Sequence, residues 1–360
     1  MPPYEIPPLP PQASLETLAV RKALIGASRA LARLDGKIDA IPNTGILIDT
    51  LTLQEARASS EIENYVTTQD DVFQIGRRPI ASLDPVQKEV ARYREALRHG
   101  HAALGGPGGL LTNNVIVGMY RLLKQTDGGF RTTPGTRLRN DATGEVVYTP
   151  PQHPASISSH MNALETYINA PPEDGLDPLV RMAIIHHQFE SIHPFSDGNG
   201  RLGRILNVLY LVQQDLLSSP VLYLSRHVNQ TKADYYRLLQ SVRDTGEWED
   251  WLLYMIGGVD RIARETTDLV ERLRTLMAEM KTRLRDTYPF YSQDLLNNLF
   301  RHPYTRIDYV MEEIGVSRPT ATKYLNRLAE DGVLVRIERG RNVYFVNGPL
   351  VDLFAEGFGD

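Results

Sequence analysis

The sequence predicts a mainly α-helical protein with one β-hairpin and a small α+β unit at its C-terminal end. Apolar residues recur every three or four positions through most of residues 13–287, which is the spacing of helices that bury one face. Segments with strand character are confined to residues 136–149 and 333–346. At 360 residues, 42% hydrophobic and 23% charged, the chain can bury a large core and divide into two or three domains.

Composition excludes several classes of protein. A net charge of -5 gives no global attraction to nucleic acid or to an anionic membrane, so such a partner would need a local basic patch. The absence of cysteine excludes disulfides, thiolate metal sites and cysteine nucleophiles. The start lacks the pattern of a secretion signal, and no run of about 18 apolar residues occurs. We therefore expect a cytoplasmic protein with no membrane partner.

The periodic segments are separated by turn and cap signals. Asp35-Gly36 reads as a helix stop, and Asp84-Pro85 reads as a capped helix start with proline in the first turn. We expect helices at residues 15–34, 51–66, 84–100, 115–124, 157–169, 179–192, 201–217, 235–245 and 249–257.

A longer amphipathic helix is expected at residues 261–287. Periodicity does not decide whether it connects domains, packs on the main body or pairs with a second subunit in a homodimer. The resulting division has a proline-rich arm at 1–12, an N-terminal helical region at 13–100, a core at 101–260, a linker helix at 261–287 and a C-terminal unit at 288–360.

The least helical part of the core is predicted to be a hairpin. Residues 136–140 and 145–149 read as short strands, separated by the turn residues 141–144 and closed by Pro150-Pro151.

The segment from His193 to Arg204 lies between two helices and has the residues of a phosphate site. Gly198, Asn199 and Gly200 can adopt positive φ, so successive amides could form an anion-binding nest at the start of a helix. Arg201 and Arg204 are three residues apart on one helix face, and both could bind phosphate oxygens.

Two further residues of this segment suit attack by a hydroxyl group on a nucleotide phosphate. Asp197 offers a carboxylate for Mg²⁺, and His193 offers a base suited to neutral pH. Taken singly, each residue has an ordinary structural explanation, but their clustering favours a functional site. We expect the Phe195 ring to anchor the loop in the core, and His186 and His187 to be structural because adjacent helical residues point about 100° apart.

The pattern His-Pro-Phe-x-Asp-Gly-Asn-Gly-Arg-x-x-Arg at residues 193–204 resembles the signature of Fic-domain proteins. The similarity extends over most of residues 4–260. It implies a Fic-type helical bundle that transfers AMP from ATP to a hydroxyl side chain (Ser, Thr or Tyr) of a target protein or of itself. By resemblance, the site residues are the base His193, the Mg²⁺ ligand Asp197 and the nucleotide-binding residues Phe195, Gly198, Asn199, Gly200, Arg201 and Arg204.

Two features refine what the resemblance implies. Relatives that resemble the Doc toxin carry lysine where this chain has Gly200, so glycine favours AMP transfer over phosphorylation. The hairpin corresponds to the family's flap, which aligns a target segment by strand addition. The implied docking residues are Arg137, Leu138, Arg139, Val146, Val147 and Tyr148.

An N-terminal motif, Ser59-x-x-x-Glu63-Asn64, matches the inhibitory motif of the same family. On the helix predicted at about 51–66, Ser59 and Glu63 share a face, and the carboxylate could pair with Arg204 where the ATP γ-phosphate would otherwise lie. The resemblance therefore implies an autoinhibited enzyme. It also offers an alternative, in which Glu63 orients a water molecule for removal of AMP.

The C-terminal unit resembles a winged-helix domain. Residues 306–346 read as helix, turn, helix and two strands, with Ser317 as an N-cap. A local basic excess makes DNA a partner to consider, so a DNA-binding regulator with a nucleotide-sensing Fic region is a second hypothesis, and a protein-docking module is a third. The residues expected to contact DNA are Arg318, Lys323, Arg327, Arg339 and Arg341.

Overall fold

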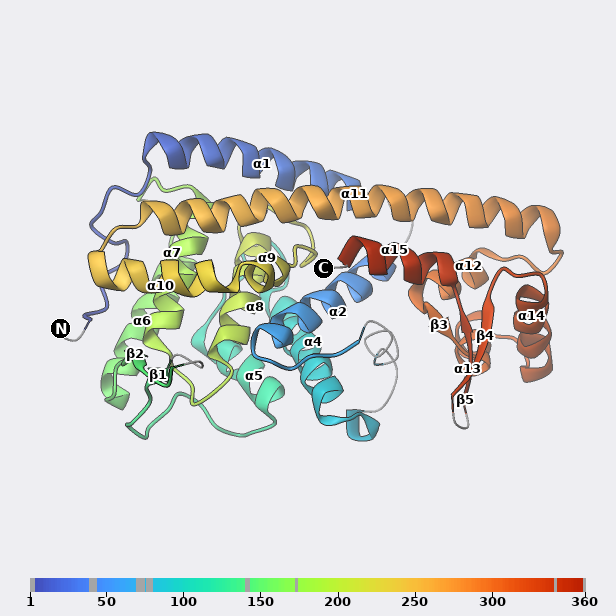
Figure 1. Ribbon diagram of the computed structural model, residues 1–360, viewed down its shortest axis with the longest axis horizontal. Helices are drawn as coiled ribbons and strands as arrows, with labels where there is room; N and C mark the ends of the chain where they lie inside the picture. The colour runs from blue at the N-terminus through green and yellow to red at the C-terminus, as the bar shows by residue number, and fades with distance from the viewer. Residues whose placement is uncertain are drawn as a thin grey trace.

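The computed structural model describes residues 4–38, 44–68, 75, 80–139, 143–171, 174–339 and 342–358. Most of these residues are helical, and two small sheets complete the described part. The prediction of a mainly α protein with a hairpin and a small C-terminal unit is confirmed. Figure 1 shows the helical body joined along one side to the C-terminal unit by the long helix α11 (Glu249–Thr287).

The main body is built from ten further helices and one hairpin among the described residues. The helices are α1 (Leu18–Ile38), α2 (Thr44–Ile62), the 3₁₀ helix η1 (Ile80–Ser82), α4 (Pro85–Leu104), α5 (Asn113–Lys124), α6 (Pro154–Asn169), α7 (Pro178–Ile192), α8 (Asn199–Gln213), α9 (Ser225–Gln230) and α10 (Lys232–Thr245). The hairpin consists of β1 (Leu138–Arg139) and β2 (Val146–Tyr148). The prediction did not include α9, and α2 begins well before residue 51.

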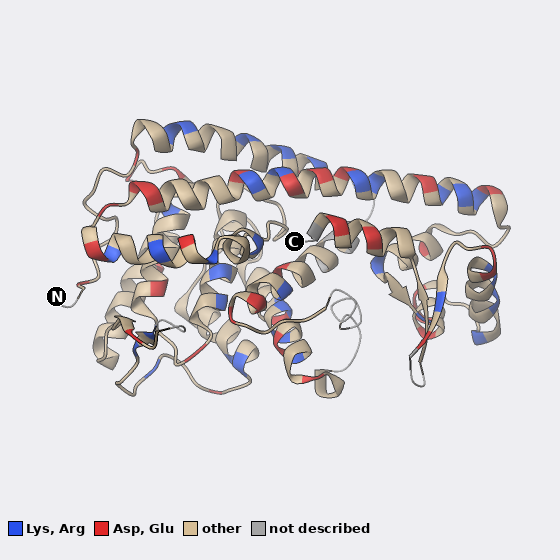
Figure 2. Cartoon of the chain, viewed as in Figure 1, with Lys and Arg blue, Asp and Glu red and all other residues tan. Residues whose placement is uncertain are grey.

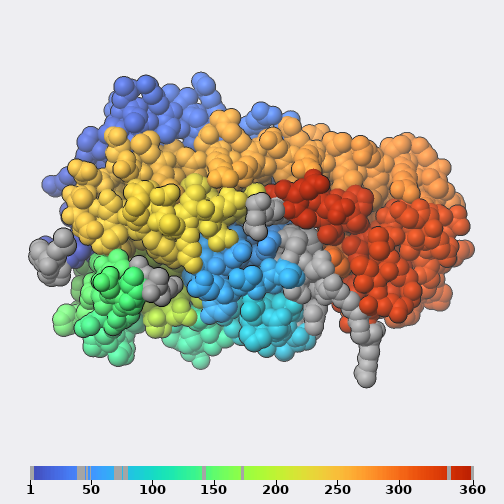
Figure 3. Space-filling view, in the orientation of Figure 1, coloured from blue at the N-terminus to red at the C-terminus, as the bar shows by residue number. Residues whose placement is uncertain are grey.

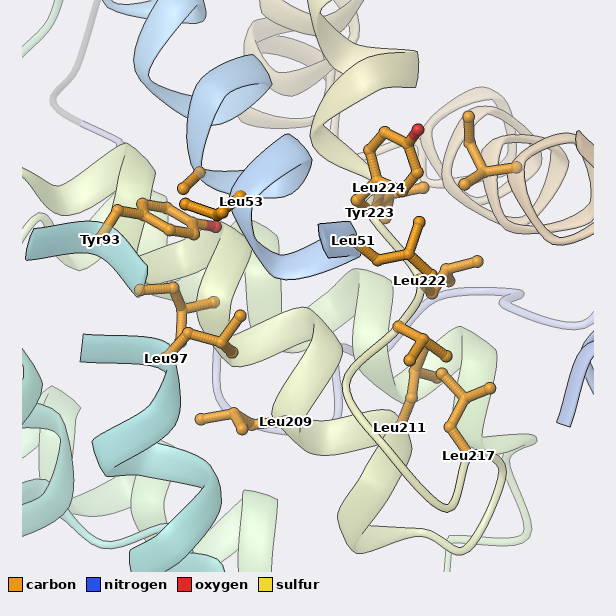
Figure 4. Close-up of a cluster of buried hydrophobic side chains, with 14 of the residues drawn as sticks. Leu51, Leu53, Tyr93, Leu97, Leu209, Leu211, Leu217, Leu222, Tyr223 and Leu224 are labelled. Carbon is orange, nitrogen blue, oxygen red and sulfur yellow. The ribbon is translucent and has the colours of Figure 1, made fainter. Parts of the chain in front are cut away.

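Two helices at the centre of the body meet at the predicted phosphate loop. α7 and α8 pack against each other, and almost every residue of both is buried. They are surrounded by α2, α4, α5, α6 and α11. Figure 4 shows part of this packing, where Leu209 of α8 lies near Leu97 of α4, with Leu51 and Leu53 of α2 nearby. Each fully buried leucine contributes about 1.5–3 kcal/mol, so the loop between α7 and α8 is mounted on the best-packed part of the molecule.

The helix stop predicted at Asp35-Gly36 is wrong, because α1 continues to Ile38. A glycine inside a helix costs only about 1 kcal/mol, and burial of Ile38 offsets that cost. The Asp35 carboxylate does not cap its own helix. It accepts hydrogen bonds from the backbone amide and hydroxyl of Ser218, at 2.7 and 2.8 Å.

The helices predicted at 249–257 and 261–287 are one continuous helix of 39 residues, α11. Burial of Trp251, Leu252 and Met255 before the glycines and of Val259 after them holds the helix through Gly257 and Gly258. α11 packs along α1 and α7 and reaches α12 and α15, so it both packs on the body and connects it to the C-terminal unit. The boundary expected at 260/261 falls inside this helix. Acidic and basic residues alternate along its length in Figure 2.

The predicted cap and hairpin are both present. Asp84 accepts a hydrogen bond from the Gln87 amide at 2.8 Å, and the Gln87 side chain accepts one from the Asp84 amide, which completes a capping box. β1 and β2 pair antiparallel, with Leu138 opposite Tyr148. Residues 140–142, which are the end of the first predicted strand and the first half of the predicted turn, lie outside the described residues.

The C-terminal unit contains a three-stranded antiparallel sheet in the order β3-β5-β4. Its elements are α12 (Gln293–Arg301), β3 (Tyr304–Thr305), α13 (Ile307–Ile314), α14 (Arg318–Glu330), β4 (Val335–Arg339), β5 (Asn342–Val346) and α15 (Gly348–Phe358). Helix, strand, helix, helix, strand, strand is the order expected of a winged helix, and that assignment stays a prediction. Ser317 is the N-cap residue of α14 as expected, although its hydroxyl pairs with the Thr320 hydroxyl at 2.9 Å and not with a helix amide.

The C-terminal unit lies against the body at two places. α12 packs on α2 and on α11, and α15 packs on α11. Figure 3 shows the C-terminal residues, in red, directly against the long helix in orange. Within the part of the chain that the structure describes, no helix is both long enough and apolar enough to cross a membrane.

Two adjacent glycines of α11, Gly257 and Gly258, allow a matched test of how α9 packs on α11. A Cβ at Gly258 would lie 2.4 Å from Cδ2 of His227, whereas a Cβ at Gly257 would meet nothing within 4 Å. We expect Gly258→Ala to lower the free energy of unfolding by about 1–3 kcal/mol through overpacking. Gly257→Ala should raise it by about 0.5–1 kcal/mol, because alanine favours the helix. Urea unfolding of both variants checks this, and equal effects at the two sites would contradict the packing of α9 on α11.

Candidate active site

The base expected in the phosphate loop, His193, ends helix α7. It has φ +49°, a left-handed conformation in which its amide donates to the Phe189 carbonyl at 2.9 Å. Burial, reinforced by the nearby guanidinium groups of Arg131 and Arg243, lowers the pKa of His193 to about 4. The imidazole is therefore neutral at pH 7 and able to accept a proton.

The loop is shaped by Asn199 and Phe195. The Asn199 side chain accepts a hydrogen bond from the Phe195 amide at 2.9 Å and donates one to the Phe195 carbonyl at 2.8 Å. The Phe195 ring is fully buried and stacks on Tyr120, with ring centroids 4.1 Å apart. The ring is therefore the core anchor that we expected, the amide and carbonyl of Phe195 are both bonded to Asn199, and a role of Phe195 in nucleotide binding stays a prediction.

The expected nest of three positive-φ residues is only partly present. Gly198 has φ +79° and precedes α8, but Asn199 and Gly200 are the first helical residues. The place expected to bind an anion is thus the start of a helix after one left-handed glycine. Gly200 is needed for another reason: a Cβ there would lie 2.9 Å from Nη1 of Arg204 and 3.0 Å from Oε1 of Glu63.

Arg201 and Arg204 are almost completely buried, with side-chain exposures of 0% and 3%. Arg201 forms ion pairs with Glu89, with Glu63 at 2.6 Å and with Asp197 at 3.8 Å. A buried cation is stable only when paired, so these carboxylates hold Arg201 in place.

Arg204 is held by the N-terminal helix α2. Its guanidinium donates to the hydroxyl and the carbonyl oxygen of Ser59, at 2.8 and 2.9 Å, and to Oε1 of Glu63 at 3.1 Å. Burial alone lowers the pKa of Arg204, but Glu63 and nearby tyrosines raise it above its usual value. The structure thus brings Ser59, Glu63 and Arg204 together. It adds a contact that the sequence did not suggest, because Glu63 also binds Arg201.

Asp197 lies at the mouth of the loop beside Lys124. Nζ of Lys124 lies 2.6 Å from Oδ2 of Asp197. Oδ1 of Asp197 also accepts a hydrogen bond from the Gly198 amide, at 2.6 Å. Burial raises the pKa of Asp197, but the bond to Lys124, the charges of Lys124 and Arg201 and the amide outweigh it and lower the pKa overall. The residue is thus an ionised carboxylate. Among the described residues no group of three potential ligand side chains is found, so a metal here would need phosphate oxygens as well, which suits Mg²⁺.

The hairpin residues divide into an anchored end and an exposed edge. The Tyr148 hydroxyl donates to the Ser191 carbonyl at 2.7 Å, and the Arg243 guanidinium lies 4.0 Å from the centroid of the Tyr148 ring. Val146 and Val147 are 42% and 45% exposed. The other predicted docking residues are Arg137 and Arg139, which are exposed, and Leu138, which is half-buried.

The predicted DNA-contacting residues lie on α14 and β4. Arg318 forms an ion pair with Asp308 at 3.0 Å, and Arg327 with Asp331 at 2.9 Å. Lys323 is exposed on α14. Arg339 ends β4, and Arg341 lies outside the described residues.

Several residues around the loop were missed by sequence reasoning. Glu89, Lys124, Arg131 and Arg243 all contact the loop or its arginines from distant segments. None carries a local pattern that marks it. His186 and His187 are buried and structural as expected, with His186 Nε2 2.8 Å from the Tyr235 hydroxyl.

Glu190 lies one helical turn before His193, fully enclosed between α7 and α8. Its Oε1 has no hydrogen-bond partner in the described part of the chain, and a Cβ at Gly203 would approach it to 2.8 Å. Burial raises the pKa of Glu190 to about 7, although Arg204 and Arg243 act in the opposite direction.

We predict that Glu190→Gln stabilises the protein at alkaline pH. Glu190 has a folded pKa of about 7 against 4.5 normally, so its contribution to stability is complete below pH 4.5 and is lost as pH rises through 7. Glutamine does not titrate. The stability of the variant relative to the parent should therefore increase between pH 5 and pH 8, by an amount on the order of 3 kcal/mol. Urea unfolding at several pH values measures this, with the exposed Glu279→Gln as control; a difference independent of pH would contradict it.

Comparison with known proteins gives three matches in separate segments of the chain. Residues 21–102 match the Fic/DOC family N-terminal model, residues 110–211 match the Fic/DOC family model, and residues 276–350 match the model described as protein adenylyltransferase SoFic-like, C-terminal domain. The second match contains the whole loop and both arginines.

Curated relatives and solved structures agree with these matches. The chain is 29% identical over 155 residues to a probable protein adenylyltransferase of Aquifex aeolicus, covering 43% of this chain and 39% of the relative. It is 27% identical over 208 residues to the protein adenylyltransferase Fic of Aedes aegypti, covering 58% and 37%. The matched region thus spans less than two fifths of the length of either relative.

Two solved structures share the fold. A Fic family protein from Desulfovibrio desulfuricans G20 superposes with a TM-score of 0.57 and 21% identity, covering 95% of this chain and 98% of that one. Residues 134–508 of Fic-1 from C. elegans give a TM-score of 0.50 and 20% identity, covering 68% and 70%. These structures support the helical fold.

Proposed function

Because the chain belongs to the Fic/DOC family, we propose that it is a protein adenylyltransferase, which transfers AMP from ATP to a hydroxyl side chain of a target protein or of itself. The observation that carries the proposal is a neutral, half-buried histidine at the end of α7, in the loop that leads into α8, the helix that holds two buried arginines. The curated relatives named protein adenylyltransferase support the same reaction.

In the proposed reaction the acceptor hydroxyl oxygen forms a bond to the α-phosphorus of ATP. The bond from that phosphorus to the bridging oxygen breaks, and pyrophosphate leaves. His193 accepts the hydroxyl proton, for which its neutral imidazole is suited. The amides at the start of α8 and the two arginines stabilise the negative charge on the phosphates.

Mg²⁺, for which Asp197 is the ligand we propose, would neutralise phosphate charge. The ionised Asp197 carboxylate is half-exposed, which leaves it accessible from solvent. Lys124 now occupies one of its oxygens. Lys124 must therefore share the carboxylate or turn toward the phosphates when nucleotide binds.

We propose that Glu63 inhibits the unmodified enzyme by occupying both arginines. Its two oxygens bind Arg201 and Arg204, and Ser59 supplies two more acceptors to Arg204. A phosphate group that needs the same guanidinium protons competes with Glu63. ATP would then bind with its phosphates out of line for transfer.

The hairpin is the proposed docking site for the acceptor segment. It is a two-stranded sheet, so its outer edge has backbone groups available for another strand, and Val146 and Val147 are exposed beside it. Tyr148 ties this edge to the last turn of α7, the helix that ends at His193. A hydroxyl on the added strand would thereby be brought toward the base.

We predict that Glu63→Gly raises the rate of self-modification by about 10-fold or more, because it releases both arginines for phosphate. Intact mass spectrometry of protein incubated with ATP and Mg²⁺ measures the added AMP. The matched control is Glu61→Gly, in the last turn of α2, which ends at Ile62 just before Glu63 and not at residue 66 as predicted; this variant should leave the rate near that of the parent.

His193→Ala in the Glu63→Gly background should abolish the addition. Equal rates in the parent, Glu61→Gly and Glu63→Gly proteins would contradict the inhibitory role of Glu63. Addition of a phosphoryl group in place of AMP would contradict the proposed reaction.

A second function of the same site is removal of AMP from a modified protein. The Glu63 side chain is 22% exposed, so water can reach its carboxylate beside the arginines. In that case Glu63→Gly would slow the loss of AMP from modified protein. The two directions are distinguished by following gain and loss of AMP with the same pair of variants.

DNA binding by the C-terminal unit is the other candidate. The exposed position of Lys323 on α14 favours it, but Arg318 and Arg327 are paired with aspartates. We expect retention on duplex DNA to be weak at about 150 mM salt and to fall steeply as salt increases. Elution from immobilised duplex measures this. Tight retention that is lost in the Arg318→Ala, Lys323→Ala double variant would instead support a DNA-binding regulator.

A further inference from the structure

The end of α7, its cap His193 and the following Pro194 carry four consecutive carbonyl groups, at residues 191–194, that no amide of the helix satisfies. Two residues satisfy all four. The Tyr148 hydroxyl donates to the first at 2.7 Å, and the Arg131 side chain donates to the second at 3.5 Å and to the third at 2.8 Å. The backbone amide of Arg131 donates to the fourth at 2.8 Å.

Arg131 also contacts the segment that directly follows strand β2 of the hairpin. Its Nη2 donates to the carbonyl oxygen of Pro151, the residue that closes the hairpin segment. The side chain is only 6% exposed, and its partners are backbone carbonyls. One guanidinium therefore connects the hairpin to the loop that carries the proposed base.

The bond to the His193 carbonyl bears on the direction of the imidazole. A non-glycine residue at φ +49° is held against a cost of about 1–2 kcal/mol, and such a conformation persists only when its surroundings fix it. The Arg131 fork binds the carbonyls of that same residue and of Ile192, and the Arg131 backbone amide binds that of Pro194. Rotation of the loop would break several of these bonds together.

We propose that Arg131 is a positioning residue for His193, and that it couples the orientation of the imidazole to the position of the β1–β2 hairpin. The inference rests on the proposed function only in taking His193 as the base. The Arg131 side chain donates to backbone carbonyl groups, so its effect passes through the backbone of the loop.

Arg131 also affects the charge around His193. After burial, Arg131 and then Arg243 of α10 lower the pKa of His193, while the Glu190 carbonyl of α7 and the Asp197 carboxylate raise it. Substitution of Arg131 can separate the effect of its forked hydrogen bonds from the effect of its positive charge. Lysine keeps the positive charge but cannot span the carbonyls of His193 and Pro151, and methionine removes both the charge and the fork.

The test uses full-length Glu63→Gly protein, in which the rate of self-modification and the KM for ATP are measured by intact mass spectrometry. We expect Arg131→Lys to lower the rate by about 10- to 100-fold with KM changed by less than about threefold, since misplacement of a base slows the chemical step. The matched control is Arg121→Met. Arg121 likewise donates from Nε to a backbone carbonyl, that of Gly128, at 3.1 Å but away from the loop, so the rate should be unchanged.

A second measurement does not depend on activity. NMR of histidine-labelled protein, with His193 assigned from the spectrum of His193→Gln, gives the pKa of the imidazole. We expect Arg131→Lys to leave it within about half a unit of the Glu63→Gly protein and Arg131→Met to raise it by about one unit or more. Unfolding midpoints confirm that the variants are folded.

A folded Arg131→Lys protein with the parental rate would overturn the positioning role. So would a loss of rate matched by an equal rise in KM, which would place Arg131 in nucleotide binding. An unchanged His193 pKa in Arg131→Met would overturn the electrostatic part. If the Glu63→Gly protein adds no AMP, the proposed function fails, whereas the NMR result still decides whether Arg131 controls the imidazole.

Discussion

The carboxylate of Glu63 between Arg201 and Arg204 is the interaction on which the rest of the site depends. Both arginines are buried in α8, at the centre of the body, where an unpaired cation would cost several kcal/mol. Glu89 also pairs with Arg201, but among the described residues Glu63 is the only carboxylate that forms an ion pair with Arg204. When Glu63 leaves, Arg204 keeps only the neutral oxygens of Ser59. The same contact that we propose as inhibitory therefore also stabilises the empty site, and a phosphate group is a fitting replacement for it.

Burial explains how the loop between α7 and α8 is held in place. α7 and α8 are buried on nearly every side, so the residues between them are held by packing as well as by hydrogen bonds. The Phe195 ring, stacked on Tyr120, anchors the loop in the core. The carbonyl groups at the end of α7 are held by hydrogen bonds from Arg131 and Tyr148. The low pKa of His193 follows from the same enclosure. The packing of the loop, the low pKa of His193 and the position of the hairpin thus all follow from the burial of the segment between α7 and α8.

The sequence predicted those parts of the fold and the site that are local in the chain. The helix cap at Asp84, the hairpin and the segment from His193 to Arg204 each carry their signal within a few residues. Glu89 and Arg131 carry none, because they reach the loop from 112 and 62 residues away along the chain. Continuity of α11 was missed for a related reason, since the glycines at 257 and 258 read as a break unless the burial around them is known. Likewise Gly200 looked like a turn residue, whereas it leaves room for Arg204 beside Glu63.

Competition between Glu63 and the nucleotide is the central claim, and crystal structures of the parent and Glu63→Gly proteins with a non-hydrolysable ATP analogue and Mg²⁺ test it most directly. The account predicts a γ-phosphate oxygen within about 3 Å of the Arg204 guanidinium in the variant. In the parent, Arg204 should remain on Glu63 and the phosphates should lie elsewhere. A parent structure with the γ-phosphate on Arg204 and the pair with Glu63 intact would contradict it.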